Sequence, residues 1–478
     1  MIQRLPLAGA AGLLAVLLSG CAVGPEYQRP AVEIPAAFKE ARLPTDETLQ
    51  WKKAQPADSL ARGRWWAVFQ DPMLDSLEDQ AMRANQDLKA AAARVEQARA
   101  LKKTARSGLY PELTAGTGPT RQRTSDASPA GGATATLWRA QTGISYEADL
   151  FGRVASHLDA ASADAERARA LYQSVMLALQ ADVAQAYFTL RQLDAEAMLY
   201  RDTVSLRRMS LNLLETRFQI GDIDELDVAR ARAELAAARS QALDIARQRA
   251  VAEHGLALLL GRAPSDFALP VQALHTISID IPAGLPSSLL ERRPDIAAAE
   301  RAVAAANARI GAAKAAFFPQ LALTGTFGFE SSDLSDLVHW SSRSFILGPL
   351  AGTMLSLPLF DGGRRQSRMD QAQARYDEDV ALYRQSVLNA FREVEDGLST
   401  LRLLGEQTNV QDTAVASATR AAELSKTQYD AGSISYLEVI DADREVLRHR
   451  HTAVQLNGLR AHAAVRLIRA IGGGWDLS

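Results

Sequence analysis

A single cysteine thiol is the most reactive side chain in this chain of 478 residues. Cys21 ends the run Leu18-Ser19-Gly20-Cys21, which follows a short apolar stretch and a lone positive charge at Arg4. A charged start, an apolar centre and small residues before the cut are typical of a secretory signal. A thiol at the cut site can be acylated, and the attached lipid then holds the mature N-terminus in a bilayer. We therefore expect a signal peptide over residues 1–20 and lipidation of Cys21, with a plain signal peptide and an accidental cysteine as the alternative.

Charged residues follow two glycine-centred turns, Ile220-Gly221-Asp222 and Ala431-Gly432-Ser433. Glycine suits a tight turn after a helix because it has no Cβ to penalise a positive φ. The first turn is followed by Asp227 and Arg230 and the second by Asp441 and Arg444, in each case one helical turn apart. Such pairs are worth little as solvated helix charges.

Enzyme chemistry finds no support in the residue patterns. The seven histidines are scattered, and His449 and His451 lie two apart on an expected helix, so they face different ways. No glycine-rich phosphate loop follows a strand, and no nucleophile elbow occurs. We expect no catalytic residue, no metal site and no cofactor other than the covalent lipid on Cys21. The net charge of −3 also gives no bulk attraction for nucleic acid.

Two long proline-free segments, 130–263 and 359–478, are expected to be helical because they are rich in Ala, Leu, Arg, Gln and Glu. Their apolar positions recur at alternating steps of three and four, which is typical of coiled-coil packing. The uninterrupted pattern from 152 to 218 would form a helix about 100 Å long. After the signal, no apolar run reaches the roughly 18 residues of a membrane-spanning helix. Any membrane crossing would therefore have to use strands.

The chain contains an internal duplication. Tyr110-Pro111-Glu112-Leu113 returns as Phe318-Pro319-Gln320-Leu321, a displacement of 319 − 111 = 208 residues. Arg217-Phe218-Gln219-Ile220-Gly221 returns as Gln428-Tyr429-Asp430-Ala431-Gly432, a displacement of 432 − 221 = 211. These matches occur in one order, and the period is far too long for a solenoid. Each copy predicts a helix, two strands, a long helix, a turn and a second long helix.

The strands expected at about 138–150 and 320–330 alternate apolar and polar residues, and 113–123 and 345–359 are expected as their partners. This period of two, over about ten residues, fits a strand with lipid on one face and water on the other. Two ordinary hairpins of a soluble sheet are the alternative. Four strands cannot close a membrane barrel, since the smallest have about eight. We therefore expect several copies to share the barrel, and the polar inner face favours three copies and twelve strands.

Two further segments carry a resemblance: Cys21-Ala22-Val23-Gly24-Pro25-Glu26-Tyr27-Gln28-Arg29-Pro30 and Leu290-Glu291-Arg292-Arg293-Pro294-Asp295-Ile296. With the duplication and the glycine turns, they make the chain resemble the outer-membrane factor (TolC-like) family, in its NodT-like lipoprotein branch. The resemblance implies a mainly α fold with a β membrane domain. Family members are trimers, with a twelve-strand β-barrel in the outer membrane and a long twelve-helix α-barrel in the periplasm.

The resemblance also implies a function and partners. Such proteins are passive exit ducts of tripartite RND (resistance-nodulation-division) efflux systems, which carry drugs and other toxic small molecules from periplasm to exterior. A homotrimer, a periplasmic adaptor, an inner-membrane RND pump and outer-membrane lipid are the implied partners, in a Gram-negative bacterium. Ala22 in place of an Asp after the cysteine favours the outer membrane. A duct for protein secretion, and a periplasmic adaptor lipoprotein, are the alternatives.

The same resemblance divides the chain into six parts. These are a signal peptide (1–20), an anchor and equatorial segment (21–80), a first repeat (81–263), an equatorial linker (264–289), a second repeat (290–471) and a tail (472–478).

The resemblance assigns roles to residues near the turns. The periplasmic gate is expected at six residues: Asp227, Tyr429, Leu437, Glu438, Asp441 and Arg444. The docking site for the adaptor is expected at the two turns: Ile220, Gly221, Asp222, Ala431, Gly432 and Ser433. Ile434 stands where TolC has an arginine that ties the gate shut, so Arg444 is the candidate for that task.

Overall fold

The computed structural model describes residues 23–40, 63–127, 131–274, 292–346 and 353–473. The expected signal peptide, Cys21 and most of the expected linker and tail lie outside the described residues. The chain forms two compact units. Unit 1 comprises Met1–Ala31, Arg94–Arg169 and Ala298–Gln385, and unit 2 comprises Val32–Ala93, Ala170–Ala297 and Ser386–Ser478.

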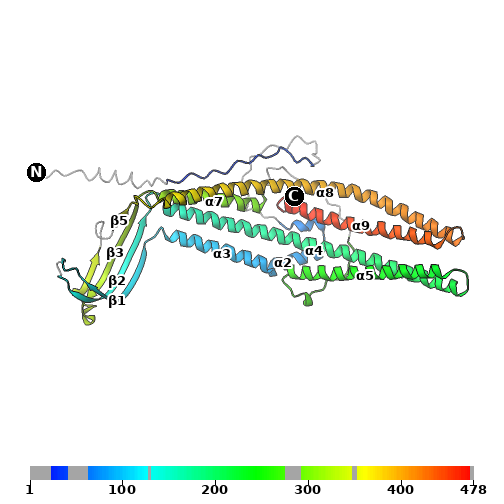
Figure 1. The fold of residues 1–478 in the computed structure, drawn as a ribbon, viewed down its shortest axis with the longest axis horizontal. Coiled ribbons are helices and arrows are strands. Elements are labelled where there is room, and N and C mark those ends of the chain that lie inside the picture. The colour runs from blue at the N-terminus through cyan, green and yellow to red at the C-terminus, as the bar shows by residue number, and fades with distance from the viewer. Residues whose placement is uncertain (1–22, 41–62, 128–130, 275–291, 347–352, 474–478) are drawn as a thin grey trace. The chain divides into compact units, whose positions relative to one another are not determined.

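A five-stranded antiparallel sheet belongs to unit 1 (Figure 1). Its strands are β1 (Glu112–Arg123), β2 (Thr134–Ala148), β3 (Gln320–Ser331), β4 (Arg343–Ile346) and β5 (Thr353–Ser356). The order is β1-β2-β3-β4, and β5 also pairs with β3. The central contact therefore joins β2 of the first repeat to β3 of the second, with Thr142 opposite Phe327.

The last expected strand differs from the structure. In place of one strand at about 345–359 there are β4 and β5, which pair with opposite ends of β3. Pro349 lies between them in the sequence and has no N–H to donate to a ladder. The polar stretch between β3 and β4 contains two 3₁₀ turns, η3 (Leu334–Asp336) and η4 (Trp340–Ser342).

The two faces of the sheet differ in polarity, as the alternation of residues predicts. Large apolar side chains are exposed on one face, where Leu113 pairs with Ile144 and Phe327 pairs with Phe345. On the other face Arg139 Nε donates to Glu330 Oε2 across β2 and β3 at 2.5 Å. A contiguous exposed apolar face is uncommon in a soluble monomer and indicates a surface that lipid or another chain covers.

The helices repeat with the duplication. They are α2 (Pro72–Ala84), α3 (Gln86–Ser107), α4 (Arg153–Gln219), α5 (Glu225–Leu259), α7 (Pro294–Ala315), α8 (Arg364–Asp430) and α9 (Tyr436–Ala470). α4 and α8 both have 67 residues, and α5 and α9 both have 35. Each of these pairs is displaced by 211 residues, whereas α3 and α7 are displaced by 208 (294 − 86). The three extra residues therefore lie between the first helix of a repeat and its long helix.

Short elements complete unit 2: η1 (Trp65–Phe69) precedes α2, and η2 (Pro264–Asp266) follows α5. Among the residues described, none of the helices is both long and apolar enough to cross a membrane.

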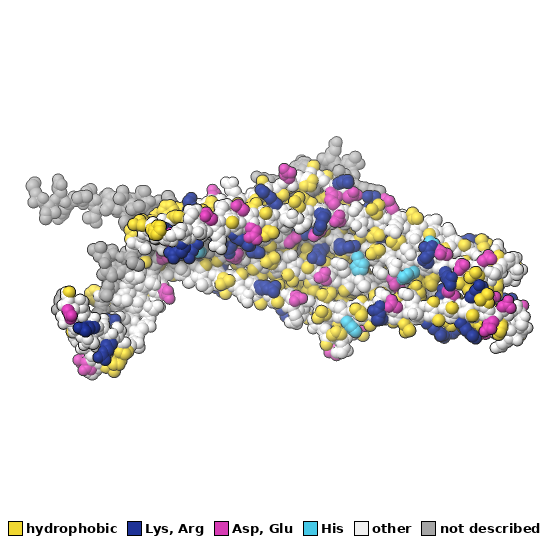
Figure 2. All heavy atoms as spheres, viewed as in Figure 1, with side chains coloured by type: hydrophobic (Ala, Val, Ile, Leu, Met, Phe, Trp, Pro, Cys, Tyr) yellow, Lys and Arg dark blue, Asp and Glu magenta, His cyan; other side chains and the backbone are white. Residues whose placement is uncertain are grey.

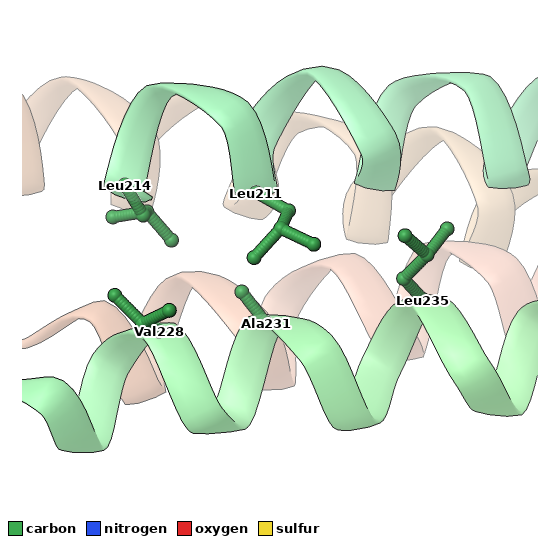
Figure 3. Close-up of a cluster of buried hydrophobic side chains, with 5 residues drawn as sticks. All are labelled: Leu211, Leu214, Val228, Ala231 and Leu235. Atoms are coloured by element: carbon green, nitrogen blue, oxygen red, sulfur yellow. The ribbon is translucent and has the colours of Figure 1, made fainter. Parts of the chain in front are cut away.

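The paired long helices pack through a narrow apolar stripe. Leu211 and Leu214 of α4 point toward Val228, Ala231 and Leu235 of α5 in Figure 3. The steps of three and four residues within this cluster place its members on one face of each helix, as the sequence pattern predicts. Leu214 is only 2% exposed, so this contact is a principal source of the apolar burial that holds the ends of α4 and α5 together.

Candidate functional site at the helix turns

Both long helices end in the same backbone motif. Gly221 has φ 78° and Gly432 has φ 73°, in the left-handed region. After α4, the N–H of Gly221 donates to Phe218 O and that of Asp222 donates to Arg217 O. The second turn repeats this, with Gly432 donating to Tyr429 O and Ser433 to Gln428 O. These are the two bonds of a Schellman cap, and glycine is required because the cap residue needs a positive φ.

The two turns contact each other through one arginine. Arg217 donates from Nε to Asp222 Oδ2 at 2.6 Å and from Nη1 to the hydroxyl of Tyr429 at 3.2 Å. Its guanidinium carbon lies 5.6 Å from the centre of the Tyr429 ring. The Tyr429 ring in turn lies 5.5 Å from that of Tyr436, at the start of α9. The end of α4 is therefore joined to the end of α8 and the start of α9.

Both predicted charge pairs form. Asp227 lies 3.6 Å from Arg230, and Asp441 lies 3.1 Å from Arg444. Arg444 has a second partner that the sequence does not reveal, because its Nε also donates to Glu234 Oε1 of α5 at 3.0 Å.

Glu234 is the centre of a network over three helices. Its other carboxylate oxygen lies 2.9 Å from Arg207 of α4, and its backbone carbonyl accepts from the same arginine at 2.8 Å. The side chain of Glu234 is 13% exposed, so this network is shielded more than the Asp441–Arg444 pair, in which both side chains are more than half exposed. Glu234 therefore ties α4, α5 and α9 together below the turns.

The region is strongly acidic. Residues 217–230 and 428–444, which we call the helix tip, contain eight carboxylates and three arginines, a net charge of 3 − 8 = −5. Figure 2 shows acidic and basic side chains gathered over this end of the helices. Several copies of this tip around one axis would focus a negative potential between them.

Burial tunes several ionisable groups of the tip. It raises the pKa of Tyr436 to about 12, with a further contribution from Asp443. Burial also raises the pKa of Asp443, against the opposing effects of Arg207 and Lys426. The hydrogen bond to Glu234 raises the pKa of Arg444, so this arginine keeps its charge at every accessible pH. The tip thus keeps a positive charge at Arg444 and a protonated hydroxyl at Tyr436.

The remaining predicted residues are more exposed. Leu437 is 38% exposed, Glu438 is exposed in the first turn of α9, and Ile220 is 76% exposed at the first turn. Among the residues that sequence reasoning missed, Arg217 could have been found, since it lies five positions before Asp222 across a glycine cap. Glu234 and Arg207 carry no local signal, because their partners come from other helices. Within the described part of the chain, no cluster of His, Cys, Asp and Glu could hold a metal ion.

Comparison with known proteins decides the family. The sequence model of the family described as "outer membrane efflux protein" matches residues 77–262 and 285–473, one segment for each repeat. The chain belongs to the outer membrane efflux protein family. The family membership expected from the resemblance is therefore confirmed.

Relatives and solved structures of the family cover almost the whole chain. The chain is 38% identical to the probable efflux pump outer membrane protein SepC of Pseudomonas putida, over 97% of this chain and 96% of SepC. It is 34% identical to the cation efflux system protein CusC of Escherichia coli O6:H1, over 97% and 98%. It superposes on the CmeC outer membrane channel of Campylobacter jejuni with a TM-score of 0.86, at 25% identity and over 96% of each chain.

These findings settle the fold and the general function of the chain. Its fold is that of the TolC-like outer-membrane channels, mainly helical with a sheet. The protein is an outer-membrane component of an RND-type efflux system, a transport duct and not an enzyme.

Proposed function

We propose that three copies of this chain form the exit duct of a tripartite RND pump, which passively conducts small toxic molecules from periplasm to exterior. A periplasmic adaptor and an inner-membrane pump are its proposed partners. Relatives are named for toluene, solvent and cation efflux, at 33–38% identity to this chain. The proposal therefore names small toxic molecules as the substrate class.

The sheet supports assembly from several copies. In the part of the chain that the structure describes, β1 has a neighbouring strand on one side only, and its exposed apolar residues need lipid or protein to cover them. An unpaired strand edge in lipid would cost several kcal/mol for each unsatisfied backbone group. Strands from further copies would remove both the unpaired edges and this cost.

The proposed gate rests on one observation: the helix tip is acidic, and side-chain contacts join its two turns. Arg217 and Tyr429 hold the two turns together, and the Glu234 network holds α9 against α4 and α5. Around a threefold axis, Asp227, Glu438 and Asp441 would contribute carboxylate rings, and Tyr429, Leu437 and Arg444 would narrow the passage. Opening would require α9 to move, and the bonds of Arg444 oppose that movement.

The turns themselves are the proposed docking site for the adaptor. Ile220 is exposed, and a Cβ added to Gly221 or Gly432 would meet nothing within 4 Å. A hairpin of a partner could therefore approach the backbone at Ile220, Gly221, Asp222, Ala431, Gly432 and Ser433, and pack in the groove beside each helix pair as a coiled-coil partner.

Single-channel conductance in planar bilayers tests the gate. Replacing Asp441 and Arg444 by Ala should raise the conductance of the closed duct, because α9 loses its bonds to α5. The same should follow from Glu234→Gln, which weakens the bond from the opposite side. Arg448→Ala is the matched control, since Arg448 is exposed on the same helix and pairs with Glu445 one helical turn before it. Equal conductance in all variants would reject the gate assignment.

We propose a lipid on Cys21 as the membrane anchor, with no other bound group. Only the sequence carries this proposal, since Cys21 lies outside the described residues. Labelled palmitate should be incorporated into the wild-type protein and not into Cys21→Ser. Incorporation into the serine variant would disprove the anchor.

A further inference from the structure

The helix ends that meet the sheet in unit 1 are rich in cations. α3 and α7 end at the strands, and α4 and α8 begin there (Figure 1). We give the name junction zone to the segments around these ends: residues 100–112, 147–157, 308–320 and 357–368. The junction zone contains nine Lys and Arg residues and four carboxylates, a net charge of 9 − 4 = +5. It is therefore as strongly basic as the helix tip is acidic.

Four cations of the junction zone are available to a partner from outside the chain. The side chains are exposed, and none has an ion-pair or hydrogen-bond partner among the described residues: Lys102, Lys103, Arg106 and Lys314. The segments that carry them, 100–110 and 308–318, contain no carboxylate. The helix dipole favours cations in the last turn of a helix, but Lys102 and Lys103 lie before the last turn of α3, which ends at Ser107.

The N-terminal segment shows which face of α7 is the outer one. Asn307 Nδ2 donates to the carbonyl of Pro25 at 3.0 Å. Gly24 packs so closely on Gly311 that a Cβ added to Gly24 would lie 2.9 Å from the Cα of Gly311. The proposed lipid on Cys21 has to lie outside the duct, and the segment that follows it lies on this face of α7. The row through Asn307 and Gly311 therefore faces outward.

The duplication extends this outer row to α3. Lys314 follows Gly311 by three residues and so lies on the same face of α7. The displacement of 208 residues places Lys103 and Arg106 of α3 where α7 has Gly311 and Lys314. Because the two repeats form the same elements and their strands pair in one sheet, Lys103 and Arg106 face outward as well.

The junction zone adjoins the apolar face of the sheet. Exposed apolar side chains lie between the helix ends and the strands: Leu109, Tyr110, Phe317, Leu359 and Phe360. Exposed Leu113 then begins the apolar face on β1. The N-terminal segment reaches the same level, since the N–H of Val23 donates to Phe151 O at 3.5 Å. An apolar face bordered by aromatic side chains and then by cations is typical of the boundary between hydrocarbon and lipid headgroups.

We propose that the junction zone binds the headgroups of anionic phospholipids at the periplasmic surface of the outer membrane, through Lys103, Arg106 and Lys314 of each copy. This inference rests on the proposed duct, in which the sheet crosses the membrane. A headgroup with a net negative charge is attracted to a zone of charge +5, whereas a zwitterionic headgroup gains no such attraction. The bound headgroups fix the depth of the duct in the membrane, in addition to the lipid on Cys21.

Spin-labelled lipids test this binding. The full-length protein is reconstituted in phosphatidylcholine bilayers, and the motionally restricted fraction of the label measures contact with labelled phosphatidylglycerol or phosphatidylcholine. The wild-type protein should prefer phosphatidylglycerol by about threefold or more at low salt, and about 0.5 M salt should screen this preference. The combined variant Lys103→Gln, Arg106→Gln, Lys314→Gln should show no preference. The matched control removes three charges from exposed positions of unit 2 and should keep it: Lys89→Gln, Arg208→Gln and Arg239→Gln.

Equal restriction of the two labels by the wild-type protein, or a preference that survives in the combined variant, would overturn the proposal. So would loss of the preference when phosphate replaces chloride at equal ionic strength, because the zone would then bind the free ion and not a lipid surface. Failure of the proposed duct has a different signature, since a protein that does not enter the bilayer restricts neither label. Restricted phosphatidylcholine in the combined variant shows that this variant is folded and inserted.

Discussion

Replacing Glu78 by methionine should stabilise the protein, and increasingly so as the pH rises. Glu78 of α2 is fully buried, and neither of its carboxylate oxygens has a hydrogen-bond partner among the described residues. Burial, helped by Asp79 and Asp75, raises the pKa of Glu78 from 4.5 to about 9. Methionine has a similar unbranched shape and no polar atom to leave unpaired.

The size of the effect follows from these pKa values. Between pH 4.5 and 9 the folded protein keeps the proton of Glu78, whereas the unfolded chain releases it. The unfolded state then binds fewer protons, so the free energy of unfolding falls as the pH rises through this range. At pH 7 the pH lies 7 − 4.5 = 2.5 units above the pKa of Glu78 in the unfolded chain. At about 1.4 kcal/mol per unit, burying the protonated side chain lowers the free energy of unfolding by about 3 kcal/mol.

Thermal unfolding in detergent at pH 5, 7 and 8 and one scan rate measures this. For a chain of 478 residues, Glu78→Met should raise Tm by roughly 3 °C at pH 7, by less at pH 5 and by more at pH 8. Glu96→Met is the control, because the side chain of Glu96 is 70% exposed beside Arg99, so its Tm should follow the wild type at each pH. A Tm difference between Glu78→Met and wild type that is the same at pH 5 and pH 8 would refute the reasoning.

Two further predictions concern the packing and the turns. Leu214→Ala should lower the free energy of unfolding by about 2–4 kcal/mol, because it leaves a cavity between α4 and α5. Leu213→Ala, at a position that is 61% exposed, should change it by less than about 0.5 kcal/mol. Gly221→Ala should cost about 1–2 kcal/mol through its positive φ alone, since no atom crowds the new Cβ. Gly405→Ala, inside α8 and equally uncrowded, should instead stabilise by about 0.5–1 kcal/mol. Chemical denaturation measures the free energy of unfolding of all four variants. Equal changes in Leu214→Ala and Leu213→Ala, or in Gly221→Ala and Gly405→Ala, would contradict the argument.

Local patterns in the sequence account for much of the fold. The turns at Gly221 and Gly432 follow from the backbone preference of glycine, and the pairs Asp227–Arg230 and Asp441–Arg444 follow from helical spacing. Hydrophobic periodicity likewise predicts the long helices and three of the four strand regions. The fourth, at 345–359, was predicted wrongly as one strand. The roles of the gate and docking residues stay predictions, and the conductance experiment tests those of the gate.

The sequence by itself determined what depends on neighbours within a few residues. This comprises the duplicated order of elements, the capped turns and the alternation of the strands. Only the tertiary structure decided which distant groups meet. It joins Arg444 to Glu234, which lies 210 residues away, and Arg217 to Tyr429, 212 residues away. It also decides that the carboxylate of Glu78 is buried with no hydrogen-bond partner among the described residues. The physical reason is that burial and pairing depend on how whole helices pack, whereas periodicity fixes only which face of a helix a residue occupies.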